Sequence, residues 1–349
     1  MNIQEISLEK LRFWFDQEKR DFPWRRNSSP YRVWISEVML QQTQSARVIG
    51  YFEEWMRRFP TVENLAQATL DEVFKVWEGL GYYSRARSLH EAAKFLVSHF
   101  DGQIPQEVYE LEQIKGLGPY TIAAIRAFAF HEKGAAVDGN VMRVLSRLFE
   151  IEEDVTLSKT QKKIRSLADS LLPEKESWVL AEAFIELGAT LCKPKAPQCH
   201  RCPLQEECQA FLHGTQSSFP VKAKKTIYEA LFREVAVIYS GEHILLKKGE
   251  PGKVMAGLYE FPYFDCEKGG LTHGMASKKL LDELSLETTF VQMLEDVKHS
   301  FTRFRVTLYP KIFSVATHKE VSGYSWQPLA IRDTLAFSSG HKRILNFLA

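Results

Sequence analysis

Four cysteines stand close together in the chain and are its strongest chemical signal. Cys192, Cys199, Cys202 and Cys208 have the spacing C-x6-C-x2-C-x5-C, and Cys266 stands apart. Four thiolates in one compact loop bind either tetrahedral zinc or a [4Fe–4S] cluster. Zinc ribbons usually carry two C-x2-C pairs, whereas this loop has one, with long and unequal arms. The spacing therefore favours an iron–sulfur cluster in a structural role, with zinc as the alternative.

Two short segments have residue types that bind phosphate. Lys193 and Lys195 lie between the first two cysteines. The segment "IKGLGPY" places Gly116 and Gly118 in a tight turn between two helical patterns, where glycine lets the backbone approach a partner closely. A helix that starts after Pro119 would offer free N–H groups to an anion. A nucleic-acid phosphate suits both segments, although surface lysines and an ordinary helix–turn–helix corner explain the same residues.

Two acidic residues have surroundings that suit acid–base chemistry. Glu37 lies in the apolar helical stretch "VWISEVML", where burial would raise the pKa of its carboxyl. Asp138 precedes Gly139 and Asn140 and has the pattern of a helix N-cap. Taken singly, an exposed helical glutamate and a capping aspartate are the ordinary interpretations.

The composition is that of an ordinary globular protein, with 45% hydrophobic and 26% charged residues. No apolar run is long enough to span a bilayer, and "MNIQEISLEK" lacks the apolar core of a signal peptide. We therefore expect a cytoplasmic protein, associated with the nucleoid if bacterial, whose clustered cysteines bind metal rather than form disulfides. The formal net charge of +1 gives no sign of nucleic acid, so that interpretation rests on motifs.

The elements that must position these residues change in type along the chain. Apolar residues recur at helical spacing from about residue 7 to 190, as in "LDEVFKVWEGL" and "YTIAAIRAFAF". After "FLHGTQSSFPVKAKK" the pattern turns to short strands such as "REVAVIYS" and "FRVTLYPKIFSVA". We expect a mostly helical region over 1–212, a linker over 213–227 and an α+β domain over 228–349.

In combination, the K-G-x-G hairpin, "AVDGNVMRV" and the four cysteines resemble the endonuclease III superfamily of helix–hairpin–helix DNA glycosylases. Within it, "PYRVWISEVMLQQTQ" and "WEGLGYYSRARSLHEAA" resemble the branch that removes adenine mispaired with 8-oxoguanine. The resemblance covers residues from about 7 to 212. It implies a base-excision repair enzyme that acts as a monomer on duplex DNA with A:8-oxoG or A:G mispairs and carries a [4Fe–4S] cluster on the four cysteines.

The resemblance also implies roles for the acidic residues. Glu37 would protonate the departing adenine, and Asp138 would stabilise or transiently capture the sugar cation. Tyr120 and Asn140 would position Asp138 and the reacting sugar. Relatives that also cut the DNA backbone have a lysine at position 120, which forms a Schiff base with the sugar. The phenol of Tyr120 cannot do so, and we expect a monofunctional glycosylase in which water completes the reaction.

The segment "GLGYYSRARSL" is expected to contact the DNA. A glycosylase flips its target base out of the duplex and must stabilise the gap. The resemblance implies that Gln42 and Tyr82 insert beside the lesion, with Tyr82 as a wedge on the 8-oxoguanine side. Arg85 and Arg87 would contact the DNA backbone, whereas Tyr83 is expected in the core.

The region 228–349 resembles a Nudix-like fold, with "GLYEFP" as its most recognisable segment. A hydrolytic Nudix box has a dense set of glutamates, but "SKKLLDELSL" supplies only Asp282 and Glu283, so pyrophosphate hydrolysis is not expected. In the family, this domain reads the 8-oxoguanine through an F-S-H turn. Here the turn is F-T-R: Thr302 keeps a hydroxyl, and Arg303 stands where the histidine usually is and could hold a phosphate.

Two other functions are open to this sequence. A glycosylase for oxidised pyrimidines or mismatched thymine is disfavoured by Tyr120, by Glu37 and by the additional domain. A non-catalytic lesion binder or an iron–sulfur redox sensor would need neither Glu37 nor Asp138. Repair or replication proteins as partners cannot be inferred from the sequence.

Overall fold

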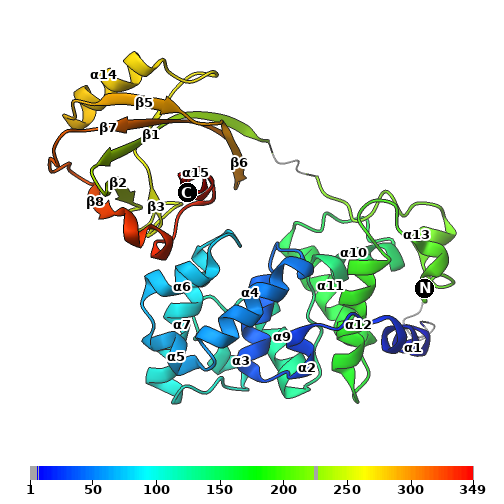
Figure 1. The fold of residues 1–349 in the computed structure, drawn as a ribbon. Helices are drawn as coiled ribbons and strands as arrows, with labels where there is room; N and C mark the ends of the chain where they lie inside the picture. The colour runs from blue at the N-terminus through cyan, green and yellow to red at the C-terminus, as the bar shows by residue number, and fades with distance from the viewer. Residues whose placement is uncertain (1–5, 7, 224–226, 349) are drawn as a thin grey trace. The chain divides into compact units, whose positions relative to one another are not determined.

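The structure is a computed structural model that describes residue 6 and residues 8–223 and 227–348 of the 349-residue chain (Figure 1). Helices make up the chain as far as residue 212, and a mixed sheet with two α-helices follows, which confirms the expected fold class. Within the described residues no helix combines the length and the apolar character needed to cross a membrane.

The chain forms two compact units whose bounds do not follow the order of the sequence. The first unit consists of Met1–Gln67 and Ser88–Lys225, and the second of Ala68–Arg87 and Thr226–Ala349. A short helical segment from the middle of the helical region thus belongs with the C-terminal sheet. Its composition does not distinguish it from the helices around it.

The first unit is entirely helical. Its helices are α1 (Leu8–Glu18), α2 (Pro23–Arg26), α3 (Pro30–Leu40), α4 (Ser45–Arg58), α5 (Val62–Gln67), α7 (Ser84–Phe100, which begins in the second unit), α8 (Val108–Leu111), α9 (Pro119–Phe130), α10 (Gly139–Leu148), α11 (Ser158–Leu171), α12 (Ser177–Thr190) and α13 (Gln209–Leu212), with a short 3-10 helix at Cys199–Arg201.

One hydrophobic core of this unit joins α1, α10, α11 and α12. Phe15, Leu145, Ile164 and Leu187 are fully or almost fully buried in it. The apolar residues of α10 recur along one side of the helix, so the opposite side and the N-terminus remain available for polar groups. This core holds α10 in place, and the candidate carboxylate Asp138 stands at its N-terminus.

Helix α3 is held by aromatic side chains. It begins with Pro30 at its first position. The hydroxyl of Tyr31 donates to the carbonyl of Phe59 (2.8 Å) and accepts from Nε1 of Trp55 (3.1 Å). Tyr31 and Trp55 are buried, yet their polar groups keep their hydrogen bonds. These contacts fix the position of α3, the helix that carries Glu37.

The second unit is built on an eight-stranded mixed sheet. Its strands are β1 (Glu229–Ser240), β2 (His243–Lys248), β3 (Tyr259–Glu260), β4 (Tyr263–Asp265), β5 (Thr289–Met293), β6 (Val297–Phe301), β7 (Phe304–Ser314) and β8 (Ser325–Pro328). The main order is β3-β2-β1-β7-β5, and β4, β6 and β8 pair with β1, β7 and β2 respectively. The long β1 and β7 pair in parallel from Glu229↔Phe304 to Tyr239↔Ser314, whereas the other pairs are antiparallel.

The two faces of this sheet have separate cores. Val235 and Val237 of β1 pack on one face, together with Ile344 of α15 (Ser339–Asn346). Ala236 of β1 packs on the other face, together with α14 (His273–Leu284). This alternation is the side-chain period of a strand, and it shows why β1 reads as a nearly continuous apolar run.

The first part of the expected linker lies along the helical unit. The main chain of Phe219 accepts from Nε of Arg147 (3.2 Å), and the carbonyl of Val221 accepts from the N–H of Val155 (3.1 Å). Part of the expected linker, residues 224–226, lies outside the described residues.

Candidate active site

Glu37 and Tyr120 meet where helix α3 packs against helix α9. Glu37 comes from α3 and is buried, with 8% of its surface exposed. The hydroxyl of Tyr120, in the first turn of α9, donates to Glu37 Oε2 at 2.6 Å. The structure therefore brings together two of the four predicted catalytic residues in a short hydrogen bond.

Asp138 caps helix α10 and is held by Asn140. Its Oδ1 accepts from the N–H groups of Asn140 and Val141, both at 2.8 Å. Its Oδ2 accepts from Nδ2 of Asn140 at 2.7 Å. The capping function and the proposed chemistry are compatible, because the cap fixes the orientation of the carboxyl group while leaving further lone pairs for a ligand.

The two carboxyl groups have different electrostatic surroundings. The pKa of Glu37 is raised to about 7, mainly by burial and to a smaller extent by the nearby Asp138, while the hydrogen bond from Tyr120 opposes the rise. Burial also raises the pKa of Asp138 above its ordinary value, although three N–H donors from Val141 and Asn140 oppose the rise. Hydrogen bonds to an ionised carboxylate favour the charged form. The site thus holds one carboxyl with a pKa of about 7 beside one whose charged form accepts three hydrogen bonds.

Helix α10 connects Asp138 to the cysteine loop through two buried arginines. Nη2 of Arg143 donates to Oδ1 of Asn140 (2.9 Å), and its Nε donates to the carbonyl of Cys192 (2.8 Å). One turn further, Nη1 of Arg147 donates to Sγ of Cys192 (3.3 Å). The side chain that orients Asp138 is therefore supported from the cysteine loop. The prediction from sequence assigned no role to either arginine, although Arg143 belongs to the quoted segment "AVDGNVMRV".

The close packing of α10 on α12 depends on a glycine. A Cβ atom at Gly188 would lie 2.6 Å from Cβ and 2.9 Å from the carbonyl oxygen of Asn140. Only glycine lets α12 approach Asn140 so closely. The residue lies in a plain helical pattern, and nothing in that pattern distinguishes it from a tolerated helical glycine.

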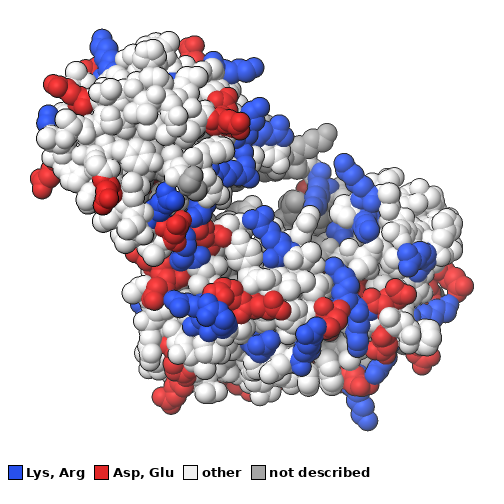
Figure 2. Space-filling model, in the orientation of Figure 1, with Lys and Arg blue, Asp and Glu red and all other residues white. Residues whose placement is uncertain are grey.

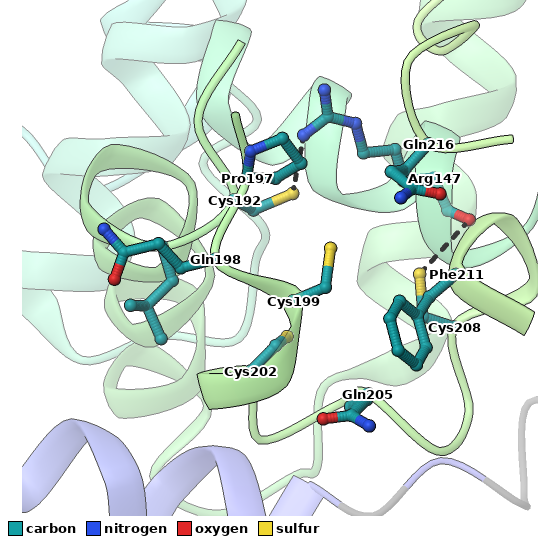
Figure 3. Close-up of a pocket in the computed structure, with 11 residues that line it drawn as sticks. Arg147, Cys192, Pro197, Gln198, Cys199, Cys202, Gln205, Cys208, Phe211 and Gln216 are labelled. Atoms are coloured by element: carbon teal, nitrogen blue, oxygen red, sulfur yellow. Dashed lines mark hydrogen bonds between the residues drawn. The ribbon is translucent and has the colours of Figure 1, made fainter. Parts of the chain in front are cut away.

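The four clustered cysteines line a single cavity (Figure 3). None of these four forms a disulfide, and all are partly exposed. The cavity is also lined by Arg147 and Phe211. Sγ of Cys208 lies 3.6 Å from the carbonyl of Arg147, which adds to the contact of that residue with Cys192.

Burial raises the pKa of three of these thiols: that of Cys199 above its usual value, that of Cys202 to about 12 and that of Cys208 to about 11. A cationic centre would therefore be required to hold them as thiolates. Among the residues that the structure describes, no three His, Cys, Asp or Glu side chains are arranged to hold a single metal ion.

The glycine turn before α9 has the expected open main chain. Gly116 has φ +96°, and a Cβ there would lie 2.8 Å from Cβ of Ser88, so this position requires glycine. A Cβ at Gly118 would meet nothing within 4 Å, which leaves free space in front of the peptide. Pro119 follows as the first residue of α9, and no side chain caps the helix. The exposed N–H groups of this turn suit an anion.

Gln42 and Tyr82, the two residues expected to insert into DNA, both have left-handed backbone conformations. Gln42 (φ +57°) follows the end of α3 and is exposed, and Tyr82 (φ +50°) is 48% exposed while its neighbour Tyr83 is buried. Such a conformation is uncommon for residues other than glycine and is retained where the surroundings enforce it. Gln42 belongs to the first unit and Tyr82 to the second.

Arg85 and Arg87 hold the second unit together. Nη2 of Arg85 donates to the carbonyl of Gly81 (3.1 Å), and burial lowers the pKa of Arg85 to about 10. Nη2 of Arg87 donates to the carbonyl of Ala256 (2.8 Å). Their predicted contact with the DNA backbone stays a prediction, and both have a structural function besides.

The remaining predicted DNA contacts are exposed. Lys193 and Lys195 lie on the surface of the cysteine loop in the first unit. Thr302 and Arg303 form the two-residue turn between β6 and β7, with Thr302 at φ +48°. Figure 2 shows basic and acidic side chains interspersed on one face of the molecule, in keeping with the net charge of +1.

Comparisons with known proteins agree with this geometry. The chain matches the model of the HhH-GPD superfamily base excision DNA repair protein over residues 35–173 and that of the NUDIX domain over residues 234–347. It is 35% identical over 360 residues to the adenine DNA glycosylase of Rattus norvegicus, with 87% of this chain and 69% of that protein covered.

A bacterial relative and a solved structure extend the likeness. The chain is 32% identical over 293 residues to the adenine DNA glycosylase of Buchnera aphidicola subsp. Baizongia pistaciae, with 84% of this chain and 81% of that protein covered. The structure of a thermostable thymine-DNA glycosylase superimposes with a TM-score of 0.54 at 26% identity, over 59% of this chain and 95% of that one.

Proposed function

The chain belongs to the adenine DNA glycosylase family, whose members act in base-excision repair, and from that premise we propose that it removes adenine paired with 8-oxoguanine or guanine by hydrolysis alone. The observation that carries this proposal is the pairing of Glu37 with Tyr120 at 2.6 Å, in a site where burial raises the pKa of Glu37 to about 7. A buried carboxylic acid that still carries its proton near neutral pH is what a poor leaving group such as adenine requires.

In the first step, Glu37 transfers its proton to N7 of the flipped adenine. The glycosidic bond then breaks, its electron pair passes to N9, and the deoxyribose becomes an oxocarbenium-like cation. Asp138 stands at the start of α10 with both oxygens oriented by hydrogen bonds. It stabilises this cation electrostatically or captures it transiently at C1′.

In the second step, water adds to C1′ and gives up a proton to the Glu37 carboxylate, which restores the acid. The proton balance closes without an amine. The residue beside Glu37 is Tyr120, whose burial raises the pKa of the phenol well above 10, so it stays neutral. A neutral phenol donates a hydrogen bond but forms no Schiff base, which supports a monofunctional enzyme.

In this proposal, residues of each unit contact the DNA duplex. The exposed N–H groups at Gly116 and Gly118 and the lysines Lys193 and Lys195 bind phosphates in this proposal. Gln42 and Tyr82 insert into the duplex beside the lesion, Tyr82 as a wedge on the 8-oxoguanine side. Phosphate contacts set the register of the enzyme on DNA, whereas the inserted side chains contact the bases.

The turn at Thr302 and Arg303 reads the base opposite the adenine. It is a two-residue hairpin turn with a β-branched residue at positive φ, a strained arrangement that is retained mainly at functional sites. The Thr302 hydroxyl can donate to or accept from the oxidised guanine. Arg303, which is 3.6 Å from Glu229, supplies a positive charge near a phosphate.

Cys192, Cys199, Cys202 and Cys208 hold a [4Fe–4S] cluster in this proposal. Their common cavity and the C-x6-C-x2-C-x5-C spacing fit four thiolate ligands. When bound, the cluster supplies structural cross-linking of the loop that carries Lys193 and Lys195. Iron and acid-labile sulfide in purified protein test this assignment, and stoichiometric zinc would contradict it.

The decisive experiment is single-turnover cleavage of labelled duplexes that carry A:8-oxoG, A:G, A:C, thymine glycol:A or T:G, each with and without alkali. We expect breaks at adenine only after alkali, fastest opposite 8-oxoguanine. Equal rates on A:8-oxoG and A:G would agree with the proposed mechanism but would contradict recognition of 8-oxoguanine by Thr302 and Arg303. Breaks without alkali, or only at pyrimidines, would refute the proposal.

A further inference from the structure

The segment Gly79–Tyr83, here called the wedge loop, is built against the C-terminal sheet. It carries the exposed Tyr82 and belongs to the same compact unit as residues 226–349. Gly79 (φ +102°), Gly81 (φ +75°) and Tyr82 (φ +50°) all have positive φ. A positive φ is energetically unfavourable for tyrosine. The conformation of this loop therefore depends on contacts with the residues around it, which anchor it.

Two of these anchors come from the loop's own helices. Nε1 of Trp77, the last residue of α6 (Leu70–Trp77), donates to the carbonyl of Gly81 at 3.0 Å. Nη2 of Arg85 donates to the same carbonyl at 3.1 Å, and its guanidinium lies over the rings of Trp77 and Tyr82. These contacts fix the tip of the loop relative to its two ends.

The other anchor is Phe337, a residue of the C-terminal domain. The N–H of Gly79 donates to the hydroxyl of Tyr83 (3.2 Å), and that hydroxyl donates to the carbonyl of Phe337 (3.3 Å). Oε1 of Glu78 accepts from the N–H of Phe337 (2.9 Å). Both backbone polar groups of this one residue are thus bound by residues at the base of the wedge loop.

Charges strengthen the second of these contacts. The side chain of Glu78 is 12% exposed and lies between Nζ of Lys75 (2.8 Å) and Nζ of Lys342 (3.6 Å). Lys75 also donates to the carbonyl of Leu335 (3.1 Å). A carboxylate that is mostly shielded from water and bound by an N–H and two ammonium groups is a well-defined hydrogen-bond acceptor.

Phe337 itself belongs to a core that also supports the turn of Thr302 and Arg303, here called the reader turn. Its ring is fully buried in the cluster that includes Val306 and Leu308 of β7. Phe301 and Phe304, the residues on either side of Thr302 and Arg303, pack against the same cluster. The reader turn and Phe337 therefore rest on one densely packed core, and such cores transmit displacement rather than absorb it.

We propose that Tyr83 and Glu78 are positioning residues that fasten the wedge loop to the domain carrying the reader turn, so that insertion of Tyr82 depends on the base opposite the adenine. This inference rests on the proposed function and adds a specificity-determining role for two residues that contact no DNA in it. The reader turn and the wedge loop then move together, so that recognition of 8-oxoguanine by the turn is coupled to insertion of Tyr82 into the duplex.

Tyr83→Phe tests the proposal with little change in packing. The variant keeps the ring, which makes an edge contact with Phe74 (5.5 Å between centroids), and deletes only the hydroxyl. Tyr309→Phe is the matched control, because the hydroxyl of Tyr309 also accepts from a glycine N–H in the same unit, that of Gly269 (2.9 Å). Thermal unfolding of both variants shows whether they remain folded.

Two readouts separate positioning from general stability. The first is the ratio of single-turnover excision rates on A:8-oxoG and A:G duplexes. The second is the fluorescence of a 2-aminopurine next to 8-oxoguanine, in a duplex where the 8-oxoguanine is paired with a cleavage-resistant 2′-fluoroadenosine. We expect Tyr83→Phe to lower the ratio by about three- to tenfold, the effect of losing one or two hydrogen bonds. The 2-aminopurine fluorescence, which reports unstacking of the bases, should fall as well. For Tyr309→Phe the ratio of rates should stay within about twofold of that of wild type.

Substitutions of Glu78 provide a second test that leaves Tyr83 intact. Glu78→Ala removes the acceptor for Phe337 N–H and should lower the same ratio, whereas Glu78→Gln keeps an acceptor oxygen and should restore part of it. Equal slowing on both duplexes with an unchanged ratio and an unchanged fluorescence signal would overturn the inference alone. Absence of adenine excision by the wild-type protein would overturn the proposed function, and the inference with it.

Discussion

Replacement of Glu37 by glutamine should lower the rate of excision but raise the free energy of unfolding, relative to wild type, as the pH increases. Glutamine has nearly the same shape and can still accept from Tyr120, but it carries no proton for adenine. General acid catalysis is worth about 10²- to 10⁴-fold in rate. We therefore expect Glu37→Gln to lose excision of adenine by at least that factor while its affinity for mispaired duplex stays close to that of wild type.

The stability effect follows from the displaced pKa. In the folded protein the pKa of Glu37 is raised from 4.5 to about 7, mainly by burial. At about 1.4 kcal/mol for each pH unit, the difference is worth about 3 kcal/mol. Because the folded pKa lies above the unfolded one, this contribution is fully present below pH 4.5 and is lost as the pH rises through 7. Glu37→Gln has no such loss, so the free energy of unfolding of the variant relative to wild type should rise by about 3 kcal/mol between pH 4 and 8.

The assay combines single-turnover excision with urea unfolding at several pH values. Glu260→Gln is the control, because burial also raises the pKa of Glu260, which belongs to the other unit and has no part in the proposed chemistry. It should keep full excision. Substantial turnover by Glu37→Gln, or unfolding free energies that stay parallel to wild type over the whole pH range, would refute the assignment of Glu37 as a buried acid.

Three further substitutions test the surroundings of this acid. Tyr120→Phe removes the hydrogen bond that lowers the pKa of Glu37, so the alkaline limb of the excision rate should move to higher pH; a limb that stays in place or moves down would contradict the coupling. Asp138→Asn retains a capping side chain but loses the charge, so excision should fall by about 10²-fold or more with the melting temperature nearly unchanged; normal rates would rule out an electrostatic role. Gly188→Ala forces a Cβ to within 2.6 Å of Asn140, and we expect about 1–3 kcal/mol of destabilisation in denaturant melts together with slower excision.

Local sequence was sufficient for the features that depend on neighbouring residues. The cysteine spacing, the glycine turn before α9 and the capping pattern at Asp138 are short-range arrangements, and the structure has each of them where the pattern places it. The change from helical to strand periodicity likewise predicted the two fold types, because periodicity reports which face of an element is buried.

The tertiary structure decided what depends on segments far apart in the chain. Glu37 and Tyr120 are 83 residues apart, and their 2.6 Å contact exists because α3 and α9 pack together. The support of Asn140 by Arg143 from the cysteine loop has the same origin. The membership of residues 68–87 in the C-terminal unit had no local signal, since α6 has the amphipathic pattern of any surface helix. Periodicity says that a face is buried but not against which partner, and only the folded chain selects that partner.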